Sequence, residues 1–372
     1  MHVLFACHRY APVTGGSERI AQYLAEAVVA RGDRATMVTQ AEPGVPSQEN
    51  LHGVAVIRLP FRRLAGFRFP VGYLRTLRSM DADVFHVHGN RIWCADLYFP
   101  FARRFGWPQL VTGHGFYQYA MHHRAWDRWY FERYLPRRLR AFDYYVADTA
   151  FEKAQLVAWG VPAAKVPIVP LGAVLEEFQG PPVPPDEVRG RWGIRAPRIA
   201  VYVGGHFANK HVERLVEVIA ATGGRWGLVV IGPDVPESPG SAQRCRELAA
   251  SLGAEVRVLG TLPRSEVLGA LYAADAVVSA STYEGFGVVL AEAMAARRPF
   301  VAWRAGAAIE MAEDGGGLVV DTVSEFIEAL QRLDDTATAR AMGERGGARA
   351  DHWSMGRMAR EYLALYDALA SS

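Results

Sequence analysis

Short runs of β-branched and other apolar residues alternate with longer helical patterns along this chain, and the alternation stops once before it restarts. Such alternation predicts parallel α/β units. The interruption lies at residues 169–185, where five prolines and two glycines are typical of a connector. We therefore predict two open parallel sheets, one on each side of the connector. The expected strands are residues 3–7, 35–40, 54–59, 84–88 and 109–112, and then 199–204, 228–232, 256–259, 276–280 and 300–302.

The expected domains follow from this pattern and from a length of 372 residues, which exceeds the roughly 100 to 200 residues of a typical domain. We place an N-terminal α/β domain at residues 1–175 and a second one at residues 190–352. Residues 353–372 carry apolar side chains at helical spacing, so this helix needs an apolar partner. We expect it to pack back on the N-terminal domain. Ligands bind outside the carboxyl ends of parallel strands, so two facing sheets predict one cleft between the domains.

Composition narrows the class of protein. Half of the residues are apolar, 22% are charged and the net charge is +2, which argues against disorder and against a protein that coats nucleic acid. Cys7, Cys94 and Cys245 are odd in number and far apart, so they predict neither a disulfide framework nor a zinc site. The chain shows no signal-peptide pattern and no run of roughly 20 apolar residues. We expect a cytoplasmic protein whose membrane contact, if any, is peripheral.

The loop after the first expected strand contains Gly15 and Gly16 directly before a helix, with Ser17 as the expected N-cap. A helix N-terminus offers unpaired N–H groups and a partial positive charge, so a phosphate or a sugar hydroxyl can bind there. The alternative is an ordinary Gly-Gly turn. The third glycine of a dinucleotide-binding GxGxxG pattern is absent.

A second glycine-containing loop follows the first strand of the second domain. It runs from Gly204 to Lys210, and the lysine could neutralise a diphosphate at the carboxyl end of the sheet. The alternative is a solvated lysine in a surface loop.

The segment from Glu284 to Glu292 is the most informative part of the sequence. Glu284 lies after an expected strand, Gly287 lies in the following turn, and a helix begins at about Val288, so its free amides face the same space as Glu284. Glu292 is the one charge in an apolar run, and an unpaired buried carboxylate costs several kcal/mol. It needs a partner, either ribose hydroxyls or an ion pair with Arg297, Arg298 or a residue of a neighbouring element.

Histidines follow two strands of the first domain. His114 stands between glycines, which leave room for a ligand near its ring, although a structural histidine is the simpler interpretation. His86 and His88 point to the same side of one strand, but no third metal ligand is in view, so we interpret them as structural or as lining the ligand site. The pair Asp81 and Asp83 resembles a metal-binding DxD pattern but precedes a strand, and we discount it.

Two stretches of the first domain, residues 61–78 and 116–142, combine arginines with aromatic side chains. This combination suits an anionic lipid surface or a phosphorylated acceptor. The alternative is a solvated arginine face that covers packed aromatic rings.

Taken together, these motifs resemble the GT4 family of retaining glycosyltransferases over nearly the full length of the chain. The resemblance implies the GT-B fold, an α/β architecture of two facing Rossmann-like domains with an interdomain cleft. The motifs that carry it are Gly15-Gly16, Thr112-Gly-His114-Gly, Val169-Pro-Leu-Gly, the loop from Gly204 to Lys210, and Glu284-Gly-Phe-Gly followed by Glu292, an E-x7-E pattern.

The resemblance also implies an activity and a role for each residue. The enzyme would move a hexose-type sugar from a UDP- or GDP-sugar to a glycan, a lipid-linked or a small-molecule acceptor, without a metal ion or other cofactor. Glu284 would contact the sugar hydroxyls, Glu292 the ribose, and His114 the region of the anomeric carbon. Backbone amides of Phe286, Gly287 and Val288 would cap the sugar or phosphate, and Gly16 would lie against the diphosphate. Gly15, Gly204 and Lys210 would be further donor-binding residues.

One position departs from the family pattern, which usually has an arginine where this chain has Gly205 and a glycine where it has His211. An arginine fork on a diphosphate is a strong charge-assisted contact, worth on the order of 1.5 to 3 kcal/mol. His206 is one candidate to replace it. The departure keeps one alternative open, a nucleotide-sugar-binding protein with little turnover. A GT-B nucleotide-sugar epimerase is a second alternative, because it would share the two sheets and the cleft.

Overall fold

The computed structural model describes residues 1–12, 15–64, 67–89, 97–99, 102–114 and 129–371. Cys94 and most of the first half of the arginine-rich stretch at residues 116–142 lie outside the described residues. The chain divides into two compact units. Unit 1 comprises Met1–Pro170 together with Arg357–Ser372, and unit 2 comprises Leu171–Gly356.

Unit 1 contains a seven-stranded sheet with the order β3-β4-β2-β1-β7-β8-β9. Neighbouring strands run parallel except for β3, which is antiparallel to β4. Strand β1 shows why the sheet forms, because Val3, Leu4, Phe5 and Ala6 have no exposed surface, as expected for a strand covered on both faces. The strands are β1 (His2–Cys7), β2 (Arg34–Gln40), β3 (Gln48–Leu51), β4 (Val54–Leu59), β7 (Val84–His88), β8 (Gln109–Thr112) and β9 (Tyr144–Val146).

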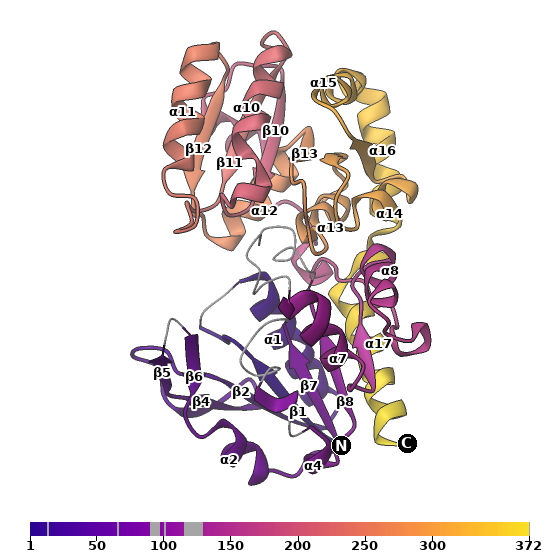
Figure 1. Cartoon of the computed structure of the whole chain (residues 1–372). Helices are drawn as coiled ribbons and strands as arrows, with labels where there is room; N and C mark the ends of the chain where they lie inside the picture. The colour runs from indigo at the N-terminus through magenta and orange to yellow at the C-terminus, as the bar shows by residue number, and fades with distance from the viewer. Residues whose placement is uncertain (13–14, 65–66, 90–96, 100–101, 115–128, 372) are drawn as a thin grey trace. The chain divides into compact units, whose positions relative to one another are not determined.

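The other elements of unit 1 connect or follow the strands of this sheet and lie around it (Figure 1). Strands β5 (Phe61–Leu64) and β6 (Phe67–Pro70) form a separate antiparallel pair. The α-helices include α1 (Gly16–Ala30), α2 (Tyr73–Arg78), α4 (Ala102–Phe105), α7 (Leu135–Leu139), α8 (Ala150–Ala158) and α17 (Met355–Ala370).

Helix α17 ends the chain and packs into unit 1 beside β7 and β8 (Figure 1). Its buried face contains Met358, Tyr362, Tyr366 and Leu369. The Tyr362 hydroxyl lies 2.6 Å from Thr112 Oγ1, and the Tyr366 hydroxyl lies 2.6 Å from His86 Nδ1. The apolar stripe is therefore supplemented by buried hydrogen bonds, so each tyrosine hydroxyl has a partner despite complete burial.

Unit 2 contains a six-stranded, fully parallel sheet with the order β12-β11-β10-β13-β14-β15. Its strands are β10 (Arg198–Val203), β11 (Trp226–Ile231), β12 (Val256–Gly260), β13 (Ala276–Ser279), β14 (Phe300–Trp303) and β15 (Gly317–Val320). Its α-helices are α9 (Pro185–Trp192), α10 (Val212–Ala221), α11 (Ser241–Leu252), α12 (Arg264–Ala273), α13 (Val288–Ala295), α14 (Ala308–Glu313), α15 (Val323–Arg332) and α16 (Thr336–Ala348). The prediction of two α/β units with parallel sheets is confirmed.

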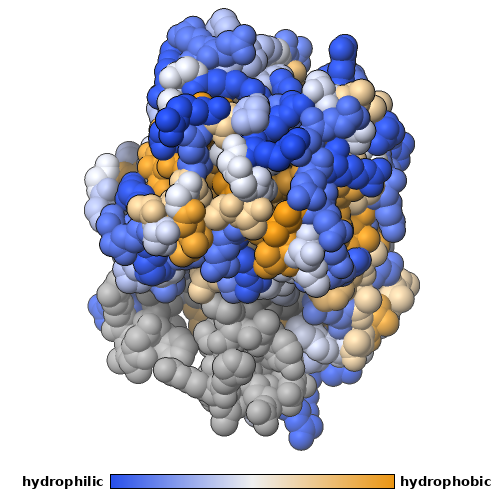
Figure 2. All heavy atoms as spheres, turned by 90° about the horizontal axis from the view of Figure 1, so that it is seen from above, coloured by the Kyte–Doolittle hydropathy of each residue, from blue (hydrophilic) through white to orange (hydrophobic). Residues whose placement is uncertain are grey.

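No helix among the described residues is both long enough and apolar enough to cross a bilayer. The face drawn in Figure 2 is covered mainly by hydrophilic side chains, with hydrophobic residues in separate patches between them.

Candidate active site

The loops that follow β10 and β13 come together because these two strands are neighbours in the sheet of unit 2. Lys210 lies after β10 and Glu284 after β13, and Lys210 Nζ forms an ion pair with Glu284 Oε1. The two side chains are 20% and 17% exposed, so both can still be reached from solvent. Ser281 Oγ donates a hydrogen bond of 2.8 Å to the same carboxylate oxygen. Two residues selected from the sequence, 74 positions apart, thus form one polar centre.

The two loops are also joined through the backbone. Asn209 Nδ2 donates to the Tyr283 carbonyl at 2.8 Å, and Thr282 N donates to the Asn209 carbonyl at 3.0 Å. These bonds fix the residues directly before Lys210 and Glu284. Contacts within the protein therefore preorganise the centre.

Helix α13 begins beside Glu284. Its N-cap is Gly287, which has a φ of 95° and makes no side-chain cap hydrogen bond. First-turn amides of a helix carry a partial positive charge and favour anions, so this N-terminus can bind an oxygen of a phosphate or a sugar. Val288 is the first helical residue. Phe286 is only 3% exposed and its ring packs near Trp353, so Phe286 can contribute to a ligand site only through its backbone.

A residue that the sequence analysis missed supports this turn. Gly306, after β14, has a φ of 57°, and a Cβ atom there would lie 2.7 Å from the Phe286 carbonyl oxygen and 2.8 Å from Glu284 Cβ. The next residue, Ala307, donates its N–H to the Phe286 carbonyl at 3.0 Å. Only glycine fits this contact, and the signal in the sequence is a glycine shortly after a strand.

Glu292 has a protein partner, which is Arg264 at the start of α12. Arg264 Nη2 lies 2.6 Å from Glu292 Oε1 and 2.5 Å from Glu177 Oε2. Burial alone would lower the pKa of the Arg264 guanidinium, but Glu292 and Glu177 outweigh burial and raise that pKa. The cation is therefore firmly held between two carboxylates, and Glu292 keeps acceptor capacity for a further donor.

The two arginines that the sequence analysis proposed as ion-pair partners of Glu292 have other partners. Arg297 pairs with Glu344, and Arg298 donates to the Tyr272 carbonyl at 2.6 Å. The sequence analysis also allowed an ion pair with a residue of a neighbouring element, and Arg264 of α12 is such a residue. Sequence reasoning missed Arg264 because it lies on a different helix.

The loop of Gly204 and Gly205 is closely packed. The Gly204 N–H donates to the Ile231 carbonyl at 2.9 Å, so this amide already has an acceptor within the protein. A Cβ atom at Gly205 would lie 3.0 Å from the Phe207 ring and 3.3 Å from Val235. The space that a longer residue would need at position 205 is partly filled by Phe207.

His206 does not replace the missing arginine. Its side chain has no exposed surface, and Nδ1 lies 3.4 Å from Asp234 Oδ1. Burial lowers the pKa of this imidazole, with Asp234 opposing the shift. A buried and largely neutral ring at pH 7 is poorly suited to neutralising a diphosphate, so this hypothesis is wrong.

His114 in unit 1 ends a chain of buried polar groups. It has a φ of 56°, and its side chain is 13% exposed. His114 Nδ1 lies 3.4 Å from Asp148 Oδ2, and His114 Nε2 lies 3.4 Å from His88 Nδ1. Burial, followed by the proximity of His114, holds the pKa of the His88 imidazole well below its usual range. The lowered pKa keeps the His88 ring neutral near pH 7, and the carboxyl group of Asp148 contacts the other ring nitrogen of His114.

Asp148 was not selected from the sequence, because the short strand before it was not predicted. The side chain is fully buried, and neither carboxylate oxygen has a hydrogen-bond partner within the described part of the chain. A buried carboxylate without partners is costly, so the contact with His114 has a strong electrostatic reason to persist.

His86 belongs to the packing of α17. Its Nε2 lies 2.9 Å from Thr112 Oγ1, and its Nδ1 contacts Tyr366. Burial, with His88 and His114 nearby, holds the pKa of His86 well below its usual range. Within the described residues, no group of three or more His, Cys, Asp or Glu side chains is arranged to hold a metal ion.

The glycines at the start of α1 differ from the expected arrangement. The N-cap is Gly15 and the helix begins at Gly16, so the prediction that Ser17 caps this helix is wrong. Ser17 Oγ instead donates to Glu18 Oε2 at 3.0 Å. Among the described residues, a Cβ atom at Gly16 would meet nothing within 4 Å. The packing of this part of the chain therefore does not require glycine there, and it leaves space for a ligand beside Gly16.

Family models match the chain in two consecutive parts: a glycosyl transferase 4-like domain at residues 15–172 and a glycosyl transferases group 1 domain at residues 197–335. A GDP-mannose:cellobiosyl-diphosphopolyprenol alpha-mannosyltransferase of Xanthomonas campestris is 25% identical, and the alignment covers 99% of this chain and 93% of that protein. A D-inositol 3-phosphate glycosyltransferase of Kineococcus radiotolerans is 31% identical over 61% of this chain, and the match spans only 58% of that relative's length.

Solved structures share the fold at low identity. Sucrose-phosphate synthase of Thermosynechococcus elongatus superposes with a TM-score of 0.83 and 23% identity, covering 100% of both chains. Anabaena HepE in complex with UDP and glucose superposes with a TM-score of 0.82 and 17% identity, covering 99% of this chain and 100% of that chain.

Proposed function

We propose that this chain, which belongs to the GT4-type glycosyltransferases of the GT-B fold, transfers a hexose-type sugar from a nucleotide diphosphate sugar with retention of configuration and without a metal ion. The observation that carries the proposal is the Lys210–Glu284 centre beside the N-terminus of α13. It offers a cation and free amides for a diphosphate and a carboxylate for sugar hydroxyls. These are complementary groups for the two halves of such a donor.

In the proposed reaction the bond between the anomeric carbon and the diphosphate oxygen breaks first. Lys210 and the first-turn amides of α13 stabilise the charge that develops on the leaving diphosphate. The acceptor oxygen then attacks the short-lived oxocarbenium ion from the face that the diphosphate leaves, and its proton passes to a leaving-group phosphate oxygen. In this scheme Glu284 holds the sugar through its hydroxyls, and the family pattern assigns His114 to the region of the anomeric carbon. No protein nucleophile and no resident cofactor is needed in this scheme.

The nucleotide of the donor is tested by ligand-induced stabilisation. Purified protein is heated with UDP, GDP, ADP or dTDP, or with the corresponding nucleotide sugars, in the presence of EDTA. A ligand that binds only the folded state raises the unfolding temperature by mass action. We propose UDP or GDP as the nucleotide of the donor, because the name of the Xanthomonas relative contains GDP-mannose and the HepE structure holds UDP. Stabilisation by no nucleotide, or only when a divalent metal replaces EDTA, would contradict the proposal.

Glu292 is proposed to hold the ribose through its carboxylate, which can accept hydrogen bonds from more than one donor. We expect Glu292→Gln to weaken binding of the nucleotide diphosphate by roughly 10- to 100-fold, because a hydrogen bond to a charged group contributes about 1.5 to 3 kcal/mol. Isothermal titration calorimetry measures the change. The matched control is Glu177→Gln, because Glu177 also pairs with Arg264 but has no proposed ribose contact. Equal losses in the two variants would show that the Arg264 pairing, not ribose binding, explains the effect.

Asp148 is proposed to position His114 through its contact with Nδ1. We expect Asp148→Asn to reduce kcat about tenfold or more with a smaller change in donor KM, because the charged partner of the His114 ring is lost. The split between kcat and donor KM is the distinguishing measurement, because loss of a positioning contact lowers kcat while donor binding is largely kept. Unchanged kcat, or losses in kcat and donor affinity that only follow a loss of stability, would assign Asp148 a purely structural role.

A nucleotide-sugar-binding protein with little turnover is the second candidate. The observation in its favour is the lack of a cation at Gly205, which His206 does not supply. Release of nucleotide diphosphate from the donor by purified protein would exclude it, and interconversion of the sugar without nucleotide release would instead favour an epimerase.

Cytoplasmic location and peripheral contact with an anionic membrane are also proposals. The second rests on the arginine-aromatic stretches of unit 1, of which Arg62 and Arg137 are exposed on described elements. Co-sedimentation with anionic liposomes at low salt tests this contact, and sedimentation that is equally strong with neutral liposomes would contradict it.

A further inference from the structure

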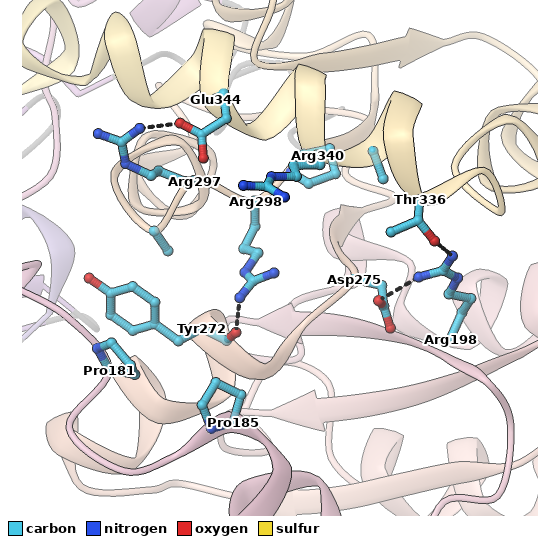
Figure 3. Close-up of a pocket in the computed structure, with 13 residues that line it drawn as sticks. Pro181, Pro185, Arg198, Tyr272, Asp275, Arg297, Arg298, Thr336, Arg340 and Glu344 are labelled. Atoms are coloured by element: carbon cyan, nitrogen blue, oxygen red, sulfur yellow. Dashed lines mark hydrogen bonds and ion pairs between the residues drawn. The ribbon is translucent and has the colours of Figure 1, made fainter.

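Unit 2 contains a cavity of about 390 Å³ at the amino ends of its central strands (Figure 3). Arg198 begins β10, Asp275 directly precedes β13, and Pro299 directly precedes β14. Lys210 and Glu284 follow the opposite ends of β10 and β13, so the cavity is separate from the candidate active site. Its volume lies in the range of small-molecule pockets.

Four arginines and two carboxylates line this cavity, and both carboxylates are already paired. Asp275 accepts from Arg198 at 3.1 Å and from Arg189 at 2.9 Å. Glu344 pairs with Arg297. Within the described residues, no carboxylate lies at ion-pair distance from the other two lining arginines, Arg298 and Arg340. The cavity therefore has an excess of positive charge.

Arg298 is the more constrained of these two cations. Its Nη2 donates to the Tyr272 carbonyl, but its Nε is buried and has no acceptor in the part of the chain that the structure describes. Burial lowers the pKa of this guanidinium, and Asp275 offsets the effect only partly. A buried guanidinium without a carboxylate is costly, and an anion in the cavity would offset that cost.

The backbone next to Arg298 is also unusual. Arg297 has a φ of 54°, in the left-handed region that favours glycine. A Cβ atom at Gly343 of α16 would lie 2.2 Å from the Arg297 carbonyl oxygen. The strained turn is thus held tightly against the helix that carries Arg340, and such strain persists where the surrounding structure enforces it.

We propose that this cavity binds a small phosphorylated molecule, with its phosphate between Arg298 and Arg340. Guanidinium groups match phosphate oxygens in geometry and charge. The remainder of the ligand packs on the apolar part of the wall, which is formed by the Tyr272 ring, Pro181 and Pro185. Figure 3 shows these residues on the side of the cavity where Arg298 donates to the Tyr272 carbonyl. A ligand with a phosphate and a planar or apolar group fits both parts.

The test uses full-length protein and two probes, inorganic phosphate and phenyl phosphate, which adds a planar apolar ring to the same anion. Calorimetric titration is expected to show binding of phenyl phosphate to the wild type, with weaker binding of inorganic phosphate. In the double variant Arg298→Gln/Arg340→Gln the affinity for phenyl phosphate is expected to fall at least tenfold. The matched control is Arg332→Gln/Arg246→Gln, which removes two arginines of unit 2 that do not line the cavity.

Lys210→Ala separates this proposal from the proposed function, because it alters the candidate active site and leaves the cavity intact. Phenyl phosphate binding that survives in Lys210→Ala and is lost in Arg298→Gln/Arg340→Gln supports the cavity. Binding that is lost in Lys210→Ala, retained in the cavity variant, or reduced equally in the arginine control would overturn the proposal. Thermal unfolding of each unliganded variant shows whether it is folded. Arg340 is exposed, so Arg340→Gln alone gives a second measurement of phenyl phosphate affinity at the same site.

Discussion

Glu284→Ala is expected to reduce turnover of the nucleotide sugar by about a hundredfold to a thousandfold, while the protein remains folded. The variant removes the carboxylate that Lys210 and Ser281 hold in place beside α13. Preorganised charged groups at a reacting centre typically contribute 10²- to 10³-fold to kcat. This variant also leaves Lys210 without its partner, so the charge distribution of the whole centre changes. Nucleotide release from the donor identified by the stabilisation screen measures the effect.

Two controls accompany this variant. Glu313→Ala removes an exposed carboxylate at the end of α14 in the same unit, and it should leave turnover unchanged. Glu284→Gln keeps the shape of the side chain and loses its charge, so it separates steric from electrostatic effects. If Glu284→Ala retained more than roughly a tenth of the wild-type turnover, Glu284 would not belong to the catalytic centre, since a loss below tenfold corresponds to less than about 1.4 kcal/mol.

Much of the fold could be predicted from the sequence because its central strands are buried on both faces. Strand β1 and strand β11 appear as continuous apolar runs, and the connector between the units is marked by prolines. Strands β9 and β15 have only 3 and 4 residues, and they were not predicted. Length alone does not decide this, because β8, β13 and β14 also have 4 residues and are predicted. Short apolar runs occur in helices and loops as well, so periodicity does not identify every short strand.

The candidate site shows the same division between local and long-range information. Glu284, Gly287 and Val288 form one local pattern, a carboxylate and a turn before a helix, and that pattern is visible in the sequence. The Lys210–Glu284 ion pair depends on β10 and β13 being neighbours, although two strands separate them along the chain. Crossover connections decide which strand ends meet.

The partners of charged residues were the least predictable feature. Glu292 was expected to need a partner, and the energetic argument for this was sound. Arg264 reaches it from α12, 28 residues away, whereas the nearby Arg297 and Arg298 point to other groups. Asp148 was missed for a related reason, because only the packed structure shows that its carboxylate is buried beside His114.

Tyr362→Ala is expected to destabilise unit 1 by about 3 to 5 kcal/mol, the cost typical of removing a large aromatic side chain from a core. Tyr362 has no exposed surface, and its hydroxyl shares Thr112 Oγ1 with His86 Nε2. The substitution leaves a cavity and removes one hydrogen-bond partner of a buried hydroxyl. The thermal midpoint of unit 1 should fall by about 10 °C, given roughly 2 to 4 °C per kcal/mol for a domain of this size.

Hydrogen exchange shows where this destabilisation acts. Amides of β7 and β8 should exchange faster in Tyr362→Ala, whereas those of β10 and β11 in unit 2 should keep their protection. Asp367→Ala is the matched control on the same helix, because its ion pair with Arg31 is exposed and such pairs contribute at most about 1 kcal/mol. Tyr362→Phe keeps the ring and should lose only the contribution of the hydroxyl. Equal losses of stability in Tyr362→Ala and Asp367→Ala would mean that exposed contacts, and not the buried face, hold α17 in place. Faster hydrogen exchange throughout unit 2 would mean that the helix stabilises both units together.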